Sequence, residues 1–381
     1  MLKIMIIAGE HSGDILGSKI MHSLKNFSNE EIIFEGVGGP LMKEVGLLKN
    51  IIPFNDLSVM GLIEILPKLP KLINHLNNLT NFIISSDPDI LITIDSPDFN
   101  FRLVKRLKNQ NFSKFHIVAP TVWAWRPSRA KKISNFYNHL FTLLPFEPKF
   151  FKEHGLPSTY IGNPVLSYMQ KGNKNFIREK FNYDDNEKFL LILPGSRSGE
   201  LKRMLPLYIE TSIKIIKNFK KIKIIIMVPD EKINLTNILI NKYVSLFKYS
   251  PIVLSSKHKN DIFSSAHYAL ATSGTVSLEL AYSNIPSVIS YKVSGLTYLI
   301  LKILVRTRWI SLPNIILNES VFPEFIQSRC TVKNLYNSIS ELIVNDHKVL
   351  RQKKLLNKAM ELLLVSNEVM EKTLPSIILK K

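Results

Sequence analysis

The sequence predicts an α/β protein made of two doubly wound halves, each a parallel sheet with helices on both faces. Three observations support this prediction. The chain has 381 residues, more than a single hydrophobic core usually serves, so two domains are expected. Short apolar runs alternate with longer segments of helical periodicity, which is typical of strands joined by crossover helices. The alternation restarts after the polar stretch 170–188, which is therefore the expected boundary.

Six apolar runs in the first half have the length and composition of buried parallel strands. They are KIMIIA (3–8), EIIFEGV (31–37), DILITI (89–94), KFHIVA (114–119), HLFTLLP (139–145) and TYIGNP (159–164). Helical patterns such as ILGSKIMHSLKN separate them, as right-handed crossovers require. Residues 1–170 are therefore assigned to an N-terminal domain.

The second half repeats the pattern and gives a C-terminal domain over 185–345. Its expected strands are FLLILPG (189–195), KIIIMVP (223–229), PIVLSS (251–256), YALAT (268–272) and PSVISYK (286–292). Residues 346–381 have a helical pattern without motifs and are assigned to a C-terminal tail. Ligands of open α/β sheets bind beyond the carboxyl ends of the strands, so the site is expected in the cleft between the halves.

Composition narrows the class of protein. The hydrophobic content of 45% indicates a globular chain with an ample core. The net charge of +19 favours anionic partners such as a nucleotide, a nucleic acid or a phospholipid surface. Lysine is frequent throughout, however, and no stripe of basic and aromatic residues typical of an RNA platform occurs. The single cysteine, Cys330, excludes an internal disulfide and fits a reducing compartment.

No segment of the sequence has the features of a membrane-targeting or membrane-spanning element. The opening apolar run is too short for a signal peptide. No stretch of 18 or more apolar residues occurs, so no spanning helix is expected. We therefore expect a cytosolic protein.

The loop AGEHSGD (8–14) follows the first expected strand. Gly9 and Gly13 permit tight turns and a close backbone approach, and Ser12 and Asp14 are able to cap the next helix. The loop lacks the full spacing of a dinucleotide or Walker motif. Turn chemistry and ligand binding are therefore both open at this position.

Two loops of the second half suit a phosphate group. In LPGSRSGE (193–200), Gly195 and Ser196 expose backbone N–H groups and Arg197 supplies a guanidinium. In ATSGTVSLELA (271–281), Ser273, Gly274 and Thr275 stand where a helix begins, and the N–H groups of a helix start favour an anion. Glu279 lies one turn further on, where a ribose contact and a surface ion pair are both open.

The stretch TIDSPDFNFR (93–102) places two carboxylates, Asp95 and Asp98, in an expected turn that contains Pro97. Either carboxylate could cap the following helix, or the pair could serve a reaction. Metal-binding motifs such as HxH, HExxH and CxxC do not occur in the sequence. The one DxD match, DPD (87–89), precedes its strand and so faces the opposite end of the sheet. No metal and no cofactor are therefore expected.

Nine motifs in order resemble the lipid-A-disaccharide synthase family, from residue 3 to about 335. The motifs are AGEHSGDILG, GVGGPLM (36–42), DLSVMGLIEIL (56–66), DSPDFN (95–100), PTVWAWRPSR (120–129), LLPFEP (143–148), LPGSRSGE, SGTVSLELA and RWISLPNIIL…PEFIQSRC (308–330). That family is similar to the GT-B glycosyltransferases, which have two Rossmann-like domains facing across a cleft.

The resemblance implies an inverting transfer from UDP-2,3-diacylglucosamine to 2,3-diacylglucosamine 1-phosphate (lipid X). The products would be a β-1′,6-linked disaccharide 1-phosphate and UDP. Direct displacement needs a base at the acceptor hydroxyl and a stabiliser for the departing UDP. We expect Asp98 to be the base, partly desolvated, and Asp95 to orient its loop on the acceptor side.

The other site residues are expected from the same resemblance. Ser196, Arg197, Ser273, Gly274 and Thr275 would hold the diphosphate, Glu279 the ribose, and Asn314 would lie near the donor sugar. Gly9, Glu10, Ser12 and Gly13 would form the acceptor wall, and Arg126 and Arg129 would receive the 1-phosphate. For the neighbouring Trp123 and Trp125, core packing and a place in the site are both open.

Acylated substrates imply an entry from the membrane. The stretches LSVMGLIEILPKLPKLI (57–73) and GLTYLILKILVRTRW (295–309) are apolar with basic ends, and each could be an interfacial patch or an ordinary amphipathic helix. Expected partners are the two lipid substrates, an anionic membrane surface at the inner face of the inner membrane, and a second copy in a homodimer; nucleic acid is not expected. The alternatives are another GT-B enzyme using a UDP-sugar, of the epimerase or lipid II glycosyltransferase type, and a non-enzymatic basic protein that binds membrane or nucleic acid.

Overall fold

The structure, a computed structural model, describes residues 1–57, 69–163, 166, 169–247, 250–366 and 368–380. The chain divides into two compact units. Unit 1 comprises Met1–Pro164 and Leu363–Lys381, and unit 2 comprises Val165–Leu362.

Unit 1 is built on a seven-stranded parallel sheet in the order β3-β2-β1-β4-β5-β6-β7. Its strands are β1 (Leu2–Ala8), β2 (Ile32–Val37), β3 (Leu47–Asn50), β4 (Ile90–Ile94), β5 (Ser113–Ile117), β6 (His139–Thr142) and β7 (Ser158–Tyr160). The strand order reverses between β1 and β4, where Ala8 pairs with Ile94. The loops that leave these two strands diverge, which opens space for a ligand at their carboxyl ends.

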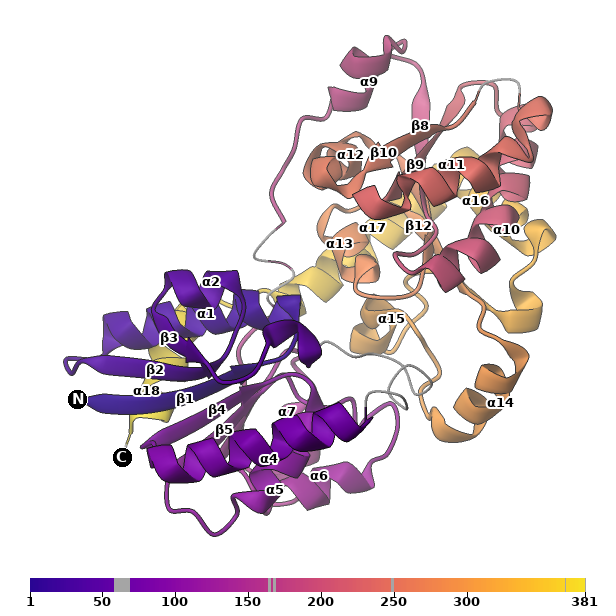
Figure 1. Ribbon diagram of the computed structural model, residues 1–381. Coiled ribbons are helices and arrows are strands. Elements are labelled where there is room, and N and C mark those ends of the chain that lie inside the picture. Colours follow the sequence, from indigo (N-terminus) through magenta and orange to yellow (C-terminus); the bar gives the residue numbers. More distant parts are fainter. Residues whose placement is uncertain (58–68, 164–165, 167–168, 248–249, 367, 381) are drawn as a thin grey trace. The chain divides into compact units, whose positions relative to one another are not determined.

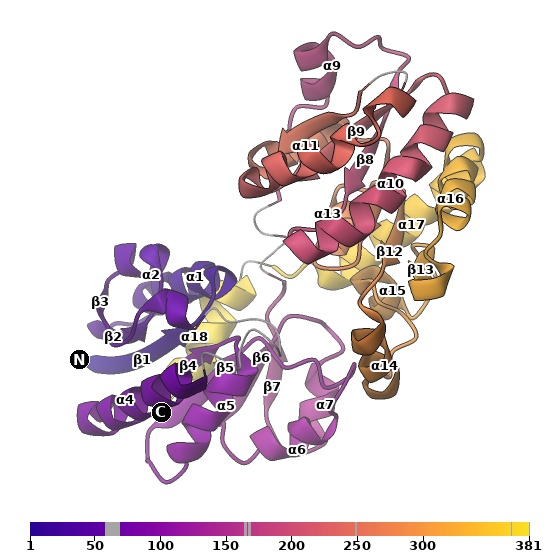
Figure 2. The same ribbon diagram turned by 45° about the vertical axis from the view of Figure 1, so that its right-hand side comes forward.

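Helices cover both faces of this sheet, as Figures 1 and 2 show. They are α1 (His11–Phe27), α2 (Pro40–Glu44), η1 (Phe54–Asp56), α4 (Leu69–Ser86), α5 (Pro97–Arg106), α6 (Ser128–Ile133) and α7 (Pro148–Lys152). Along β1, Ile4 and Ile6 belong to one hydrophobic cluster with α1, whereas Met5 and Ile7 belong to a second with α4 and α5. The strand buries both faces, which explains its continuous apolar sequence.

The last residues of the chain complete unit 1. The π-helical turn η7 (Val369–Thr373) and helix α18 (Leu374–Leu379) lie beside α1, and Leu374 and Ile378 are buried in the same cluster as Ile4. The Tyr160 hydroxyl of β7 donates a hydrogen bond of 2.7 Å to the carbonyl of Leu363. The end of the chain is therefore part of the core of unit 1.

Unit 2 is built on a six-stranded parallel sheet in the order β10-β9-β8-β11-β12-β13. Its strands are β8 (Lys188–Leu193), β9 (Ile222–Val228), β10 (Ile252–Ser255), β11 (Tyr268–Thr272), β12 (Ser287–Tyr291) and β13 (Glu324–Ile326). Here the order reverses between β8 and β11, so the loops after these two strands flank the second switch point.

The helices of unit 2 also lie on both faces of their sheet (Figure 2). They are α9 (Phe176–Phe181), α10 (Ser198–Asn218), η3 (Asp230–Lys232), α11 (Ile233–Asn241), η4 (Val244–Leu246), η5 (Ser256–His258), α12 (Lys259–Ser265), α13 (Val276–Tyr282), α14 (Gly295–Leu304), α15 (Leu312–Leu317), η6 (Gln327–Arg329), α16 (Val332–Val344) and α17 (Asp346–Leu363). Leu190 and Ile192 of β8 pack with apolar residues of α10 and α16 in one large cluster.

The predicted fold class of two doubly wound parallel α/β halves is confirmed. Two strands, β3 and β13, were not predicted, because their four and three residues are too short for a clear pattern. The unit boundaries differ from the ranges assigned from the sequence. The residues assigned to a separate tail, 346–381, are instead divided between helix α17 of unit 2 and the end of unit 1.

Candidate functional site

The loop after β1 lies against the loop after β4. A Cβ atom on Gly9 would stand 3.0 Å from Ser96 Oγ and 2.9 Å from Leu57 Cβ, so only glycine allows this approach without movement of a neighbour. Glu10 is the half-buried N-cap residue of α1, Ser12 is exposed and Gly13 is buried. The structure therefore brings the predicted acceptor wall next to the turn that carries the two carboxylates.

Asp14 has a different role from the predicted capping of α1. Its buried carboxylate accepts backbone N–H groups of Gly39, Leu41 and Met42 at 2.8–3.1 Å. These are the first N–H groups of α2, so Asp14 caps that helix and fixes the GVGGPLM loop to α1.

The turn after β4 has a strained backbone that is held by hydrogen bonds. Asp95 and Ser96 both have positive φ angles, 53° and 42°, although neither is glycine. The Asp95 carboxylate accepts the N–H of Ser96 at 2.8 Å, and the Asn100 amide donates to the carbonyl of Asp95 at 2.7 Å. Burial raises the pKa of Asp95, against the effect of its bond to Ser96. Asp95 therefore anchors the turn, and no side chain caps α5.

Asp98 stands in the first turn of α5, directly after Pro97, and its side chain is 66% exposed. The expected desolvation of this carboxylate is not observed in unit 1. Its partner is Arg129 of α6, whose guanidinium forms an ion pair with Asp98 Oδ1. Arg129 is itself mostly buried, so the pair joins a packed guanidinium to an exposed carboxylate.

The PTVWAWRPSR segment places a cationic and aromatic group beside this pair. The guanidinium carbons of Arg126 and Arg129 lie 4.4 and 5.5 Å from the centre of the Trp125 ring. Arg126 is exposed and has no carboxylate partner among the residues that the structure describes. Trp125 therefore stacks with both guanidinium groups. Trp123 instead donates to the buried Glu147 carboxylate at 3.0 Å, which indicates a structural role.

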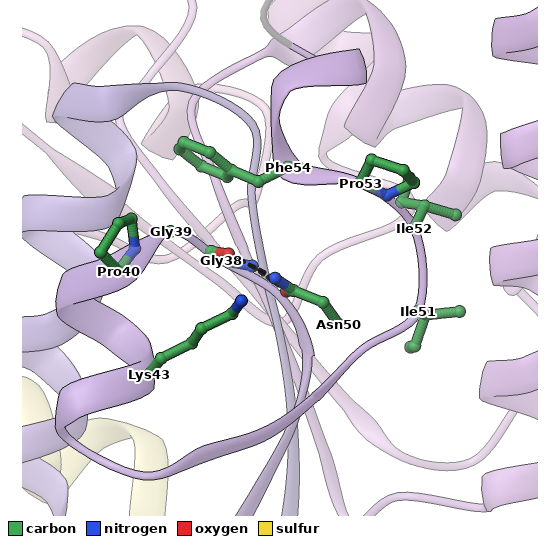
Figure 3. A pocket seen from close by; sticks show the side chains of 9 residues that line it. All are labelled: Gly38, Gly39, Pro40, Lys43, Asn50, Ile51, Ile52, Pro53 and Phe54. Atoms are coloured by element: carbon green, nitrogen blue, oxygen red, sulfur yellow. Dashed lines mark hydrogen bonds between the residues drawn. The ribbon is translucent and has the colours of Figure 1, made fainter.

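A pocket of about 490 Å³ opens at the carboxyl ends of β2 and β3, on the same edge of the sheet. Two of its lining residues, Gly38 and Asn50, are joined to each other by two hydrogen bonds of 2.8 and 2.9 Å. The exposed Lys43 points toward them, as Figure 3 shows, and has no ion-pair partner within the described ranges. Unit 1 thus presents, beside Arg126 and Arg129, a further cation at this edge of the sheet, which the sequence did not single out.

In unit 2, the loop after β8 turns through Gly195, whose φ angle is 103°. Ser196 and Arg197 are exposed. Arg197 is the N-cap residue of α10, and its guanidinium lies 3.4 Å from the Glu200 carboxylate. The Tyr291 hydroxyl donates to the same carboxylate at 3.0 Å, which joins the first turn of α10 to the end of β12.

The loop after β11 begins α13. Ser273 donates to the carbonyl of Ile310 at 2.9 Å, while Gly274 and Thr275 are exposed. Glu279 is buried, and Lys259 of α12 donates to its Oε1 at 2.6 Å. The surface ion pair within one helix that the sequence left open is therefore excluded, because the partner comes from another helix and the carboxylate is inside.

The predicted contact of Asn314 with the donor sugar does not fit its environment. Its side chain is fully buried and makes four hydrogen bonds, two donated to Phe322 O and Glu324 Oε1 and two accepted from Val321 N and Phe322 N. These bonds use both donors and both acceptor positions of the amide. Asn314 therefore holds the segment 321–324 in place and has no capacity left for a ligand.

The predictions on metal binding and membrane contact can be compared with the structure only for the residues that it describes. Among the described residues, no group of three or more His, Cys, Asp or Glu could hold a metal ion, and no helix is long and apolar enough to cross a membrane. Residues 58–68 of the stretch 57–73 lie outside the described residues. In its described part, Lys71 pairs with Asp56 at 2.7 Å.

Helix α14 presents the second predicted membrane patch. Leu299 is 61% exposed, and Leu304 and Val305 are also exposed. Lys302 and Arg306 are exposed beside them. Apolar side chains in water next to cations are the composition of an interfacial helix.

Comparison with known proteins gives a consistent result. The family model described as lipid-A-disaccharide synthetase matches residues 4–378. Two relatives named lipid-A-disaccharide synthase, from Rickettsia typhi and Rickettsia conorii, are 38% and 37% identical over 366 residues. The first alignment covers 94% of each chain, and the second covers 92% of this chain and 81% of the relative.

Solved structures share the architecture at low sequence identity. S. aureus MnaA with UDP has a TM-score of 0.64 at 14% identity and covers 99% of this chain and 96% of its own. Acinetobacter baumannii MurG has a TM-score of 0.57 at 12% identity and covers 100% of both chains. These similarities show that the two parallel α/β sheets have the fold of the GT-B type. The chain belongs to the lipid-A-disaccharide synthetase family and acts in lipid A biosynthesis.

Proposed function

We propose that the enzyme transfers a 2,3-diacylglucosaminyl group from UDP to the 6-hydroxyl of 2,3-diacylglucosamine 1-phosphate, with inversion at the anomeric carbon. The products are the β-1′,6-linked disaccharide 1-phosphate and UDP. Membership of the family supports the substrates. The observation that carries the chemistry is the exposed Asp98 carboxylate, held by Arg129 at the start of α5.

Asp98 acts as the general base. An inverting displacement requires a carboxylate that reaches the attacking hydroxyl. Asp98 is the exposed carboxylate of this turn, and its ion pair with Arg129 limits the directions in which it can point. Asp95 serves by fixing the turn, because its carboxylate is engaged with Ser96 and lies deeper in unit 1.

The acceptor binds along the loops of unit 1. Gly9, Glu10, Ser12 and Gly13 form its wall. The exposed guanidinium of Arg126, spread over Trp125, receives the 1-phosphate, because the planar donors of arginine match a phosphate group. Arg129 contributes its charge to the same region while it holds Asp98.

The donor binds along the loops of unit 2. Ser196, Arg197 and the helix start at Ser273, Gly274 and Thr275 hold the diphosphate, and Glu279 accepts from the ribose. Arg197 is exposed at the start of α10, and its guanidinium lies 3.4 Å from the Glu200 carboxylate, the distance of a weak surface pair. These groups neutralise the departing UDP without a metal ion, so chelation with EDTA is expected to leave turnover unchanged.

Lipid substrates reach the site from an anionic membrane surface to which the enzyme binds peripherally at the inner face of the inner membrane. The exposed Leu299, Leu304 and Lys302 of α14, and Arg306 just after the helix, support this proposal for unit 2. A homodimer is also proposed; its test is the mass of the purified protein in solution by light scattering.

The test of the base is UDP release by Asp98→Asn and Asp95→Asn, with and without lipid X. Loss of a general base is expected to lower kcat by about 10²–10⁴-fold in Asp98→Asn. Asp95→Asn is expected to lower the thermal midpoint as well, because Asp95 anchors the turn. A folded Asp98→Asn enzyme with near-normal turnover would refute the assignment.

A further inference from the structure

Glu147 is a buried acidic residue that joins two loops at the carboxyl edge of the unit 1 sheet. It is 3% exposed and is the N-cap residue of α7, in the loop that follows β6. Its Oε1 accepts the indole N–H of Trp123 at 3.0 Å, and Trp123 lies in the loop that follows the neighbouring strand β5. The two loops are therefore linked through the interior of unit 1.

The other carboxylate oxygen of Glu147 closes its own loop. Oε2 accepts the backbone N–H groups of Leu143 and Leu144 at 3.1 and 3.0 Å. Burial raises the pKa of Glu147 to about 7, and the three N–H donors oppose this shift. The hydrogen bonds thus offset the lost hydration of the carboxylate without fully cancelling it. What they provide is a fixed direction for the Trp123 ring, which also contacts Phe146 edge-on, with 5.3 Å between the ring centres.

The loop that holds Trp123 also carries the cation proposed for the acceptor phosphate. This loop turns back at Thr121, whose carbonyl accepts the backbone N–H of Trp125 at 3.1 Å. The Trp125 indole donates to Thr121 Oγ1 at 2.9 Å, and the guanidinium carbon of Arg126 lies 4.4 Å from the centre of the Trp125 ring. The exposed Arg126 is therefore supported by a turn that Glu147 fixes from inside the protein.

We propose that Glu147 is a positioning residue that acts through Trp123 and holds the loop 120–126 in the conformation in which Arg126 receives the acceptor phosphate. This inference rests on the proposed acceptor site and adds to it the residue that orders the loop before the substrate binds. A site that is already ordered binds its ligand more tightly, because only the competent fraction of the protein takes up the ligand.

The first test uses Trp123→Phe, which removes the N–H donor but keeps an aromatic ring and the two backbone bonds of Glu147. At about pH 8, above the pKa of Glu147, this variant is expected to raise KM for lipid X about 10-fold. With an acceptor that lacks the 1-phosphate, KM is expected to stay unchanged. The value of kcat is expected to stay within about threefold, because Arg129, the partner of Asp98, lies on α6, which has its own buried side chains in the core.

Glu147→Gln is expected to give the same pattern, since a neutral amide is a weaker acceptor for the indole N–H. Glu153→Gln is the matched control, because that carboxylate is exposed at the other end of α7. Equal losses with the phosphorylated and the unphosphorylated acceptor would overturn the inference, because they would indicate general damage to unit 1.

A double variant shows whether Trp123 acts through Arg126. Arg126→Gln combined with Trp123→Phe is expected to have a KM for lipid X within about twofold of that of Arg126→Gln alone. The reason is that the position of the loop no longer matters once the guanidinium is absent. Losses that multiply in the double variant would overturn the inference.

The indole N–H signals in proton–nitrogen NMR spectra test the link without turnover. The protein has three tryptophans, so single replacements by phenylalanine assign the signals. In Glu147→Gln, the Trp123 signal is expected to shift because its acceptor has changed, and the Trp125 signal is expected to shift with it. An unchanged Trp125 signal would overturn the inference. Absence of sugar transfer by the wild type, with both signals shifted in Glu147→Gln, would instead count against the proposed function.

Discussion

Asp95 and Asp98 show how one turn gives two carboxylates different roles. Asp95 bonds to the backbone of its own turn, and burial raises its pKa. Asp98 projects into solvent and is directed by Arg129. Asp95 precedes Ser96, the N-cap residue of α5, whereas Asp98 lies in the first turn of that helix. The environment of each side chain, more than its identity, decides which can serve a reaction.

A buried histidine beneath this turn predicts acid sensitivity. His116 is fully buried, and its Nδ1 lies 2.8 Å from Thr93 Oγ1; burial lowers its pKa from about 6.5 to about 3. The unfolded chain therefore binds a proton that the folded chain does not, so stability falls as the pH drops from 6.5 toward 3. The cost is about 1.4 kcal/mol per pH unit.

Urea denaturation at pH 7 and pH 4.5 tests this expectation. His116→Gln is expected to reduce the difference in unfolding free energy between the two conditions by about 2–3 kcal/mol. His154→Gln, at an exposed position, is the matched control. An unchanged pH slope in His116→Gln would mean that other groups cause the acid sensitivity.

Arg126 predicts selectivity for a phosphorylated acceptor. Arg126→Gln is expected to raise KM for lipid X about 10- to 100-fold, since a charge-assisted contact contributes about 1.5–3 kcal/mol. With an acceptor that lacks the 1-phosphate, the same variant is expected to behave like the wild type. Steady-state rates of UDP release give both values.

Lys43→Gln is the matched control for Arg126, because Lys43 is another exposed cation at the same edge of the sheet. It is expected to change KM for lipid X by less than about threefold. If Lys43→Gln shows the phosphate-dependent loss and Arg126→Gln does not, the phosphate lies in the pocket beside β2 and the assignment to Arg126 is wrong.

Among the elements, α14 predicts salt-sensitive binding to anionic membranes. The double variant Lys302→Gln, Arg306→Gln is expected to weaken binding to phosphatidylglycerol vesicles about 10- to 30-fold, because each basic residue near the surface contributes about 1 kcal/mol. Leu299→Ser is expected to weaken binding to neutral vesicles too, because it removes an exposed apolar side chain.

Co-sedimentation with vesicles at low and high salt measures both effects. Lys242→Gln with Leu246→Ser is the matched control, since it changes an exposed lysine and an exposed leucine outside α14. Equal binding of all variants, or no binding of the wild type at low salt, would contradict the membrane role of α14.

Most elements of the fold could be predicted, because strands buried on both faces leave continuous apolar runs such as Ile90–Ile94. The short edge strands β3 and β13 left no such signal. The loops of the site were also found, since glycines and short polar residues follow the strands directly. The packing of the C-terminal residues against unit 1 could not be predicted, because Leu374 and Ile378 are separated from their partners in α1 by most of the chain.

The side chains that contact the candidate site residues could not be predicted from the sequence. Lys259 and Glu279 are 20 positions apart on different helices, and no periodicity relates them. Asn314 was expected near a ligand because it lies in a motif, yet its four hydrogen bonds give it a structural role. A charged residue at the start of a short helix, as at Lys259, is the kind of signal that could have drawn attention to the pair.

At the scale of the whole molecule, each unit supplies one half of the proposed chemistry. Unit 1 carries the carboxylate and cations for an acceptor, and unit 2 carries the polar loops and the buried Glu279 for a nucleotide. The net charge of +19 suits substrates and a surface that are all anionic.

The measurement that tests this account most directly is the structure of the product made from UDP-2,3-diacylglucosamine and lipid X in the presence of EDTA. The account predicts UDP and a disaccharide 1-phosphate in equal amounts, with proton NMR showing a β-1′,6 linkage. Hydrolysis of the donor without a disaccharide, an α linkage, or turnover that stops with EDTA would contradict the proposed metal-free, inverting transfer.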